Sequence, residues 1–314
     1  MRNWKAGCRR RGIVSAAIML VGLSLTAAAS QQERAAMPPI EEIAENLYLL
    51  AASDSADRAS WTGGNTAVFV TEAGVVLVDT KLPGYGQDFI ERVREVTDKP
   101  ITMVINTHTH FDHSGSNNEL PDTITVVAHE NTRANMARAE CSPVTNCEAF
   151  QGENAKYLPK RTYTERMSLF SGPEQIDLYH FGPGHTSGDT FVVFRAARMM
   201  HTGDMFQTMN MPFIDFANSG GSASEFARTL SKAVAGVSGV DAIIAGHSNT
   251  LLAWEDFTTF TGFMNGFLDA AREGMESGTA VDAAADAFLA RDHPGFTIDP
   301  QRVHANMQAI YDGQ

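Results

Sequence analysis

The chain has 314 residues, of which 43% are hydrophobic and 19% are charged, so it is long and apolar enough to bury one large core. Acidic residues outnumber basic ones, and the formal net charge of −13 repels nucleic acid and anionic membranes. This balance counts against a nuclease, and we expect no nucleic-acid partner.

The first residues have the pattern of a cleavable secretory signal. A basic start precedes an apolar run over residues 13–27, and three consecutive alanines then offer a small-residue cleavage site. We predict a signal peptide over 1–29 and a polar leader over 30–46, and therefore a periplasmic or secreted mature chain with no membrane span. The Arg10-Arg11 pair also fits a twin-arginine signal loosely, and a retained N-terminal anchor is the alternative.

The first predicted elements after the leader are strands and one helix. An apolar run over 47–50 predicts a strand, and two further runs over 66–70 and 75–79 flank a turn and predict a hairpin. Apolar residues at helical spacing predict a helix over 87–98, which leads to a buried strand over 101–105. This order of elements implies an α/β core built in layers.

The remaining elements continue this pattern and end in helices. The following segment is predicted to contain strands over 124–127, 174–181, 191–194, 198–201 and 242–245, and helices over 131–138 and 222–235. From residue 254 onward the chain is predicted to be helical, with breaks near Gly278, Pro294 and Pro300. We therefore place the main domain at 47–252 and a helical extension, packed on that domain, at 253–314.

Two cysteines remain after removal of the predicted signal peptide. Cys141 and Cys147 lie in a segment over 140–159 that has no helical or strand period and is interpreted as a surface insertion. Because exported proteins fold in an oxidising compartment, we predict a disulfide between them. A buried pair of free thiols is the alternative.

A histidine-rich segment follows the predicted strand at 101–105. It contains His108, His110, Asp112 and His113, and imidazole and carboxylate groups are the ligands that zinc and similar metals prefer. Period-two alternation directs the first three of these side chains to one side. His113 breaks the alternation, so we expect the chain to turn there and to present ligands to two neighbouring ions. A polar loop with accidental histidines is the alternative.

Three later segments each place a histidine or an aspartate beside a glycine after a predicted strand. The residues concerned are His185, Asp204 and His247. A glycine beside a ligand lets the backbone approach closely and adopt unusual dihedral angles, which a crowded metal site requires. Each segment alone is a weak signal, but together, in this order after the histidine-rich segment, they are a strong one.

In these four segments the sequence resembles the metallo-β-lactamase superfamily, and the resemblance extends over residues 47–247. It implies an α/β fold of the αββα sandwich type, with two sheets packed face to face, helices outside and, here, additional C-terminal helices. It assigns His108, His110 and His185 to a first metal, Asp112, His113 and His247 to a second, and Asp204 to a bridge between them. Asp79 matches the family's early aspartate, which supports a ligand histidine, whereas Lys81 stands where the family usually has glycine.

The predicted ligand set suits hydrolysis. It would accept zinc, manganese or iron, and we favour two Zn²⁺ ions. Zinc lowers the pKa of a bound water to about 7, which supplies a hydroxide nucleophile at neutral pH. We expect Asp112 to position this nucleophile as well as to bind metal. The sequence therefore predicts an exported dinuclear zinc hydrolase that attacks a carboxylic ester, a lactone or an amide-like bond in a small molecule.

The predicted bridging aspartate decides how we rank the candidate reactions. True β-lactamases of this superfamily generally carry cysteine or serine at or near the place of Asp204, whereas glyoxalase II, lactonases and many esterases resemble this chain there. We therefore rank β-lactam hydrolysis second. An iron-dependent redox enzyme with the same ligands is the third hypothesis, and an exported binding protein with a vestigial site is the fourth.

The segment directly after Asp204 is rich in methionine and phenylalanine, which suits a partly apolar substrate. We predict a substrate pocket lined by Phe206, Met209, Met211 and Phe213, with Trp61 as a second lip. A loop that merely covers the core is the alternative.

Overall fold

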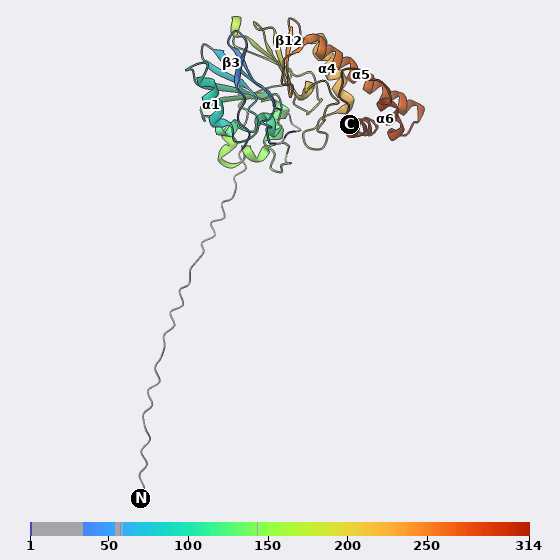
Figure 1. The fold of residues 1–314 in the computed structure, drawn as a ribbon, viewed down its shortest axis with the longest axis horizontal. Helices are drawn as coiled ribbons and strands as arrows, with labels where there is room; N and C mark the ends of the chain where they lie inside the picture. Colours follow the sequence, from blue (N-terminus) through green and yellow to red (C-terminus); the bar gives the residue numbers. More distant parts are fainter. Residues whose placement is uncertain (2–33, 54–56, 58, 143) are drawn as a thin grey trace. The chain divides into compact units, whose positions relative to one another are not determined.

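The computed structural model describes Met1 and residues 34–314, except 54–56, 58 and 143 (Figure 1). Beyond Met1, the predicted signal peptide over residues 1–29 lies outside the described residues and stays a prediction. Arg34–Gln314 cluster as one unit, and this unit holds every element described below.

The first sheet consists of seven strands whose spatial order follows the chain. They are β1 (Ile40–Ala44), β2 (Leu47–Leu50), β3 (Thr66–Thr71), β4 (Gly74–Val78), β5 (Ile101–Ile105), β6 (Thr125–His129) and β7 (Arg161–Tyr163). Neighbours from β1 to β4 pair antiparallel, and those from β4 to β7 pair parallel. Every residue of β4 is buried, which is typical of a strand covered on both faces.

The second sheet consists of six strands from the C-terminal half. In spatial order they are β13 (Leu252–Ala253), β12 (Ala242–Ala245), β11 (Met199–Gly203), β10 (Phe191–Phe194), β9 (Ile176–Tyr179) and β8 (Arg166–Leu169). In this sheet β11 and β12 pair parallel, and the other neighbouring strands named above pair antiparallel. Both sheets are therefore mixed.

Helices cover the outer faces of the two sheets (Figure 1). The α-helices are α1 (Gly86–Arg94), α2 (Phe111–Ser114), α3 (Glu130–Met136), α4 (Ala223–Gly236), α5 (Trp254–Ser277), α6 (Val281–Leu289) and α7 (Pro300–Tyr311). Short 3-10 helices occur at Asn117–Glu119, Cys147–Phe150, Gly152–Tyr157, Gly172–Glu174 and Asp204–Phe206. In Figure 1, α1 lies beside the strands of the first sheet, α4 and α5 lie on the side of the second, and α6 lies beyond them, beside α5.

Alternation along β10 shows how the layers are held together. Val192 and Phe194 belong to the core between the sheets, where Phe194 packs edge to face on Phe69 of β3 with ring centroids 5.4 Å apart. Phe191 and Val193 point the other way and pack against the helices. The predicted αββα sandwich with C-terminal helices is confirmed.

Several details differ from the sequence-based expectations. No strand was predicted for Ile40–Ala44, which lies in the expected leader and pairs with β2. The insertion over 140–159 contains two 3-10 helices, and a disulfide joins Cys141 and Cys147 as predicted. The helices within the described residues lack the combination of length and apolar character that a membrane crossing requires.

Candidate metal centre and pocket

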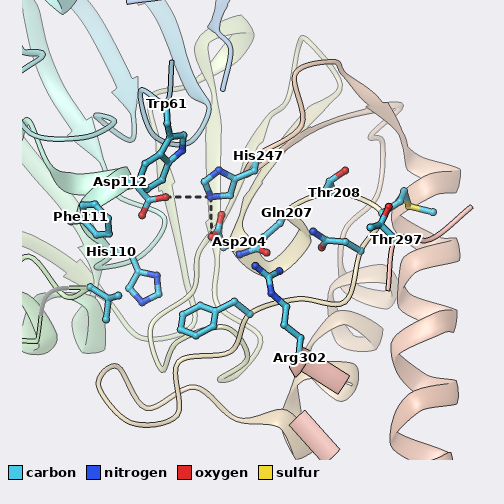
Figure 2. Close-up of a pocket in the computed structure, with 14 residues that line it drawn as sticks. Trp61, His110, Phe111, Asp112, Asp204, Gln207, Thr208, His247, Thr297 and Arg302 are labelled. Carbon is cyan, nitrogen blue, oxygen red and sulfur yellow. Dashed lines mark hydrogen bonds and ion pairs between the residues drawn. The ribbon is translucent and has the colours of Figure 1, made fainter. Parts of the chain in front are cut away.

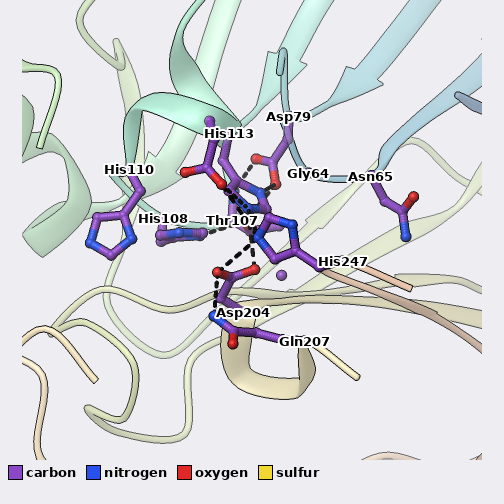
Figure 3. Close-up of polar contacts among 12 residues, drawn as sticks. Gly64, Asn65, Asp79, Thr107, His108, His110, His113, Asp204, Gln207 and His247 are labelled. Atoms are coloured by element: carbon purple, nitrogen blue, oxygen red, sulfur yellow. Dashed lines mark hydrogen bonds and ion pairs between the residues drawn. The ribbon is translucent and has the colours of Figure 1, made fainter. Parts of the chain in front are cut away.

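The candidate ligands gather where strands of both sheets end. Asp79 follows β4 and His108 follows β5, and these two strands are parallel neighbours. Asp204 follows β11 and His247 follows β12, which are the parallel neighbours of the other sheet. Because the carboxyl ends of parallel strands meet at one edge, these loops converge (Figure 3).

The histidine-rich segment enters this edge through a sharp change of direction. His110 is extended, with φ −63° and ψ 149°, and the helical turn α2 starts at Phe111. We expected the turn at His113, so the chain turns two residues earlier than predicted. Because of this turn, Asp112 and His113 lie with His247, whereas His108 and His110 lie with His185. The expected division into two groups needs such a separation.

The first group consists of His108, His110, His185 and Asp204, each of which offers one ligand atom within 4.8 Å of the others. His110 Nδ1 lies 2.9 Å from His185 Nε2, and His185 Nε2 lies 3.5 Å from Asp204 Oδ2. His108 Nε2 is buried and has no hydrogen-bond partner within the part of the chain that the structure describes. A buried lone pair without a partner is costly unless it binds something else.

The second group consists of Asp112, His113 and His247. His247 Nε2 lies 3.3 Å from both His113 Nε2 and Asp112 Oδ2, and the latter oxygen lies 3.7 Å from His113 Nε2. A tetrahedral zinc ion with bonds of about 2.0–2.1 Å holds neighbouring ligand atoms about 3.3 Å apart. The spacing and the chemistry of the donors therefore fit a divalent ion.

Asp204 lies between the two groups. Its Oδ1 is 3.1 Å from His113 Nε2, and its Oδ2 is 3.2 Å from His247 Nε2. The residue before His247 has to be a glycine for reasons of space, because a Cβ at Gly246 would lie 2.1 Å from Asp204 Oδ1. Gly64 has the same role in the polar loop after β2, because a Cβ there would lie 2.3 Å from the His113 ring.

Further polar groups fix the orientation of two candidate ligand histidines, His113 and His185. His113 Nδ1 donates to Asp79 Oδ2 at 2.7 Å, and His185 Nδ1 donates to the Phe213 carbonyl at 2.8 Å. Asp79 also accepts hydrogen bonds from the backbone N–H and the hydroxyl of Thr107. Both of its oxygens are thus engaged, which holds the His113 ring in one orientation, and the support of a metal ligand that the resemblance implied stays a prediction.

Asp215 contacts His110 in the same way, and no sequence pattern identified it. His110 Nε2 donates to Asp215 Oδ2 at 3.1 Å, which leaves Nδ1 facing the first group. Ser219 and Asn218 also donate to the Asp215 carboxylate. These bonds, together with the one from His110, outweigh burial and hold the pKa of Asp215 well below its usual value.

The electrostatics of the site favour a positive charge between its carboxylates. Burial together with neighbouring histidines lowers the pKa of His108 well below 6.5, so this imidazole is neutral. Burial also acts to lower the pKa of His247, but Asp204 and Asp112 outweigh it and raise the pKa to about 9. Burial would raise the pKa of Asp112, but His113 and His247 outweigh it and lower the pKa to about 2.

A pocket of about 610 Å³ opens above the candidate ligands (Figure 2). Its lining residues are Trp61, His110, Phe111, Asp112, Val144, Asp204, Gln207, Thr208, Met209, Asn210, Phe213, His247, Thr297 and Arg302. Three of the predicted pocket residues, Trp61, Met209 and Phe213, are therefore among them. Phe206 and Met211 lie instead in the core, where Phe206 stacks on Phe260 with ring centroids 4.8 Å apart.

No sequence pattern marked two of the polar residues that line the pocket. Gln207 follows Asp204 by one helical turn, and its Nε2 donates to Asp204 Oδ2 at 2.7 Å. Arg302 comes from α7, in the predicted C-terminal extension, and points into the pocket (Figure 2). The extension therefore forms part of the pocket wall.

Comparisons with known proteins agree with the fold. Residues 59–256 match the family described as the Metallo-beta-lactamase superfamily. The chain is 20% identical over 244 residues to a metallo-beta-lactamase type 2 from Elizabethkingia meningoseptica, covering 76% of this chain and 89% of that protein. It is 27% identical over 137 residues to the 2,4-dinitroanisole O-demethylase subunit alpha of a Nocardioides species, covering 42% of this chain and only 38% of that subunit.

The crystal structure of the DIM-1 metallo-beta-lactamase superimposes with a TM-score of 0.57 at 17% identity. The superposition covers 74% of this chain and 99% of that one. At this level of identity the likeness establishes the fold alone.

Proposed function

The chain belongs to the metallo-beta-lactamase superfamily and is therefore a metal-dependent hydrolase, and we propose that it is an exported dinuclear zinc enzyme that opens β-lactam rings. The similarity to a metallo-beta-lactamase type 2, which spans 89% of that protein, carries the choice of substrate. This choice reverses the order that we reached from the sequence, where esters and lactones stood first.

Asp204 supports a second candidate, the hydrolysis of a carboxylic ester or lactone. Its carboxylate approaches ligand atoms of both groups, at 3.1 Å from His113 Nε2 and 3.5 Å from His185 Nε2. A carboxylate at this place is the feature by which the sequence resembled lactonases and esterases rather than true β-lactamases. The attacked group is a carbonyl in both candidates, so the same centre serves either reaction.

The side chains have distinct roles in the proposed reaction. Zinc bound by the two groups would lower the pKa of a water ligand and polarise the substrate carbonyl. Asp112 is ionised, lines the pocket and lies beside the second group, so its carboxylate can accept a hydrogen bond from the attacking water. Asp79 and Asp215 each hold one nitrogen of His113 and His110, so the other nitrogen of each ring would be left to bind an ion.

Export is supported by two independent features. The signal-like segment over residues 1–29 is one, and the Cys141–Cys147 disulfide is the other, because disulfides persist in oxidising compartments. Mass spectrometry of the chain isolated from periplasm or medium tests this part: a mature N-terminus near residue 30 supports export, and an intact N-terminus in the cytoplasm contradicts it.

The substrate proposal is tested on the purified mature chain. Metal analysis should find close to two zinc ions per chain, and nitrocefin should be hydrolysed in a chelator-sensitive manner. Turnover of γ-lactones or p-nitrophenyl esters without nitrocefin turnover would transfer the assignment to the second candidate. Two bound iron ions with no hydrolysis of any of these compounds would favour redox chemistry instead.

The role of Asp112 has its own test. Asp112→Asn keeps the shape of the side chain but removes the charge that holds the water, so kcat should fall at least about 100-fold. Full activity in this variant would refute the assignment. Asp122→Asn, at an exposed carboxylate outside the pocket, is the matched control and should behave as the unmodified chain.

A further inference from the structure

We propose that Arg302 of α7 binds a carboxylate of the substrate, and that the C-terminal extension thereby selects anionic substrates. The inference rests on the proposed hydrolytic function of the neighbouring metal centre. It adds to that function a second anchoring point, supplied by a helix that follows the two-sheet domain in the chain.

The guanidinium of Arg302 has free hydrogen-bonding capacity inside the pocket. Its Nη1 donates to the Met211 carbonyl at 3.1 Å, and its Nε lies 3.7 Å from Asp299 Oδ2, beyond hydrogen-bond range. Its Nη2 makes no hydrogen bond to the described residues. A guanidinium has five N–H donors in a planar fork that matches a carboxylate, so most of its donors are available to a ligand.

The position of Arg302 is not explained by helix stability. It is the third residue of α7, in the first turn, where the helix dipole favours acidic side chains and disfavours cations. The first turn of α7 itself contains no acidic residue, and the carboxylate nearest to this charge is that of the N-cap Asp299, 3.7 Å from Arg302 Nε. An exposed pair at this distance contributes little, so Arg302 breaks a local preference that Asp299 offsets only weakly, which makes it a candidate for a functional role.

The charges that line the pocket are unevenly distributed. The two acidic residues, Asp112 and Asp204, are candidate metal ligands, and Arg302 is the only arginine or lysine among the described residues that line the pocket. Apart from the candidate ligands, the polar side chains there, such as Thr208 and Asn210, are neutral. A substrate whose carbonyl lies at the metal centre therefore finds one fixed cation within the same pocket, and a carboxylate is the group that matches it.

The C-terminal segment holds this part of the pocket in place. Thr297 donates its backbone N–H to the Met209 carbonyl at 2.9 Å and accepts from the Met211 N–H at 3.2 Å. The buried Asn306 of α7 donates to the Pro212 carbonyl at 3.1 Å. The loop over the metal centre and the first turns of α7 are thus fixed to each other, so the cation is preorganised for binding.

The test compares Arg302→Gln with Arg272→Gln in the zinc-loaded chain. Arg272 is the matched control, because it forms the same kind of i,i+3 pair with Asp269, also at 3.7 Å, but on α5 and outside the pocket. Two substrate pairs differ in one negative charge: penicillin G against its methyl ester, and mono-p-nitrophenyl glutarate against p-nitrophenyl butyrate. Zinc content and melting temperature of each variant are measured alongside.

Arg302→Gln should lower kcat/KM for the anionic member of a pair by about 10- to 100-fold, as expected for loss of a charged hydrogen-bonded pair, and leave the neutral member within threefold. Arg272→Gln should change neither. An equal loss on both members would show that Arg302 acts only by holding the Met211 loop, and an unchanged anionic member would show that it binds no carboxylate. Either result overturns the proposal.

A binding measurement separates failure of this inference from failure of the proposed function. If the unmodified chain hydrolyses none of the four compounds, the proposed function fails, and Arg302 is judged by calorimetry with glutarate and its monoamide, glutaramate. A preference for glutarate that falls about tenfold in Arg302→Gln supports the anion site. A preference that is absent, or the same in both proteins, refutes it.

Discussion

The floor and the wall of the pocket are built in different ways. By the floor we mean the seven candidate ligands, His108, His110, Asp112, His113, His185, Asp204 and His247, of which His110, Asp112, Asp204 and His247 line the pocket and the other three lie beneath its surface. The wall consists of Trp61, Met209, Phe213, Thr297 and Arg302. His108, His113 and His185 are fully buried, whereas Phe213 is 39% exposed and the Arg302 side chain is 37% exposed.

The two regions also differ in how their side chains are held. Three histidines of the floor each donate a hydrogen bond to a residue outside the candidate ligands. The acceptors are Asp79 for His113, Asp215 for His110 and the Phe213 carbonyl for His185. The wall is assembled from separate loops and the C-terminal segment, and backbone hydrogen bonds join its parts. A rigid floor preserves the chemistry while a wall made of loops can vary, so the floor should determine the reaction and the wall the substrate.

The strongest test of this division is the removal of the residue shared by both ligand groups. Asp204→Ala deletes the carboxylate that contacts His113, His185 and His247, so we expect loss of metal and a fall in kcat/KM of about 1,000-fold or more. Metal analysis and steady-state kinetics measure both effects. Asp241→Ala, at a carboxylate that is 66% exposed, is the control. A fully active Asp204→Ala chain with its metals intact would contradict the assignment of the floor.

The next test separates the two groups within the floor. Asp215→Asn weakens the orientation of His110 in the first group, and Asp79→Asn that of His113 in the second. Each variant should bind one of two zinc ions about 10- to 100-fold more weakly and leave the affinity for the other nearly unchanged. Competitive titration with a chromophoric chelator resolves the two steps. If both variants weakened the same single step, the division into two groups would be wrong.

The sequence predicted the floor much better than the wall, for a physical reason. His108, His110, Asp112 and His113 fall within one short segment after a buried strand, so their grouping is a local property. The turn at Phe111, which the alternation pattern missed, depends on where α2 begins and not on the identity of the ligands.

The supporting and wall residues depend instead on long-range packing. Asp215 reaches His110 across 105 positions, and Arg302 meets Met211 across 91. Neither residue lies in a periodic pattern or beside a glycine that would mark it. Phe206 and Met211 show the converse problem, since an apolar residue in a loop can face the pocket or the core, and only the packing of α5 on the second sheet decides it.

A third test addresses Lys81, which connects the floor with the loop that carries Trp61. Its buried Nζ donates to the carbonyls of Ala51 and Gly64 at 3.0 and 2.9 Å, and Gly64 borders the His113 ring. Burial lowers the pKa of Lys81 from 10.5 to about 7. Between these values the unfolded chain binds a proton that the folded chain does not, so stability should rise with pH by about 1.4 kcal/mol per unit.

Lys81→Met removes this contribution, so the comparison is made between the variant and the unmodified chain. The free energy of unfolding is measured in urea at pH 7.5 and pH 9.5. From the lower to the higher pH, it should rise by about 2–3 kcal/mol more in the unmodified chain than in Lys81→Met. An equal change in the free energy of unfolding of the two proteins would show that Lys81 keeps its proton when buried. The hydrogen bonds to Ala51 and Gly64 would then be those of an ammonium ion throughout this range.

The smallest expected effect is at the rim of the wall. Trp61 packs edge to face on Phe111, with ring centroids 5.7 Å apart, and belongs to the loop after β2. Trp61→Ala should raise KM for an apolar substrate by about 3- to 10-fold, because the ring supplies contact area but no ligand atom, and Trp61→Phe should restore most of it. Metal content and kcat should stay unchanged in both variants. A loss of metal in Trp61→Ala would mean that this loop also holds the floor through Gly64, and that the wall and the floor are not independent.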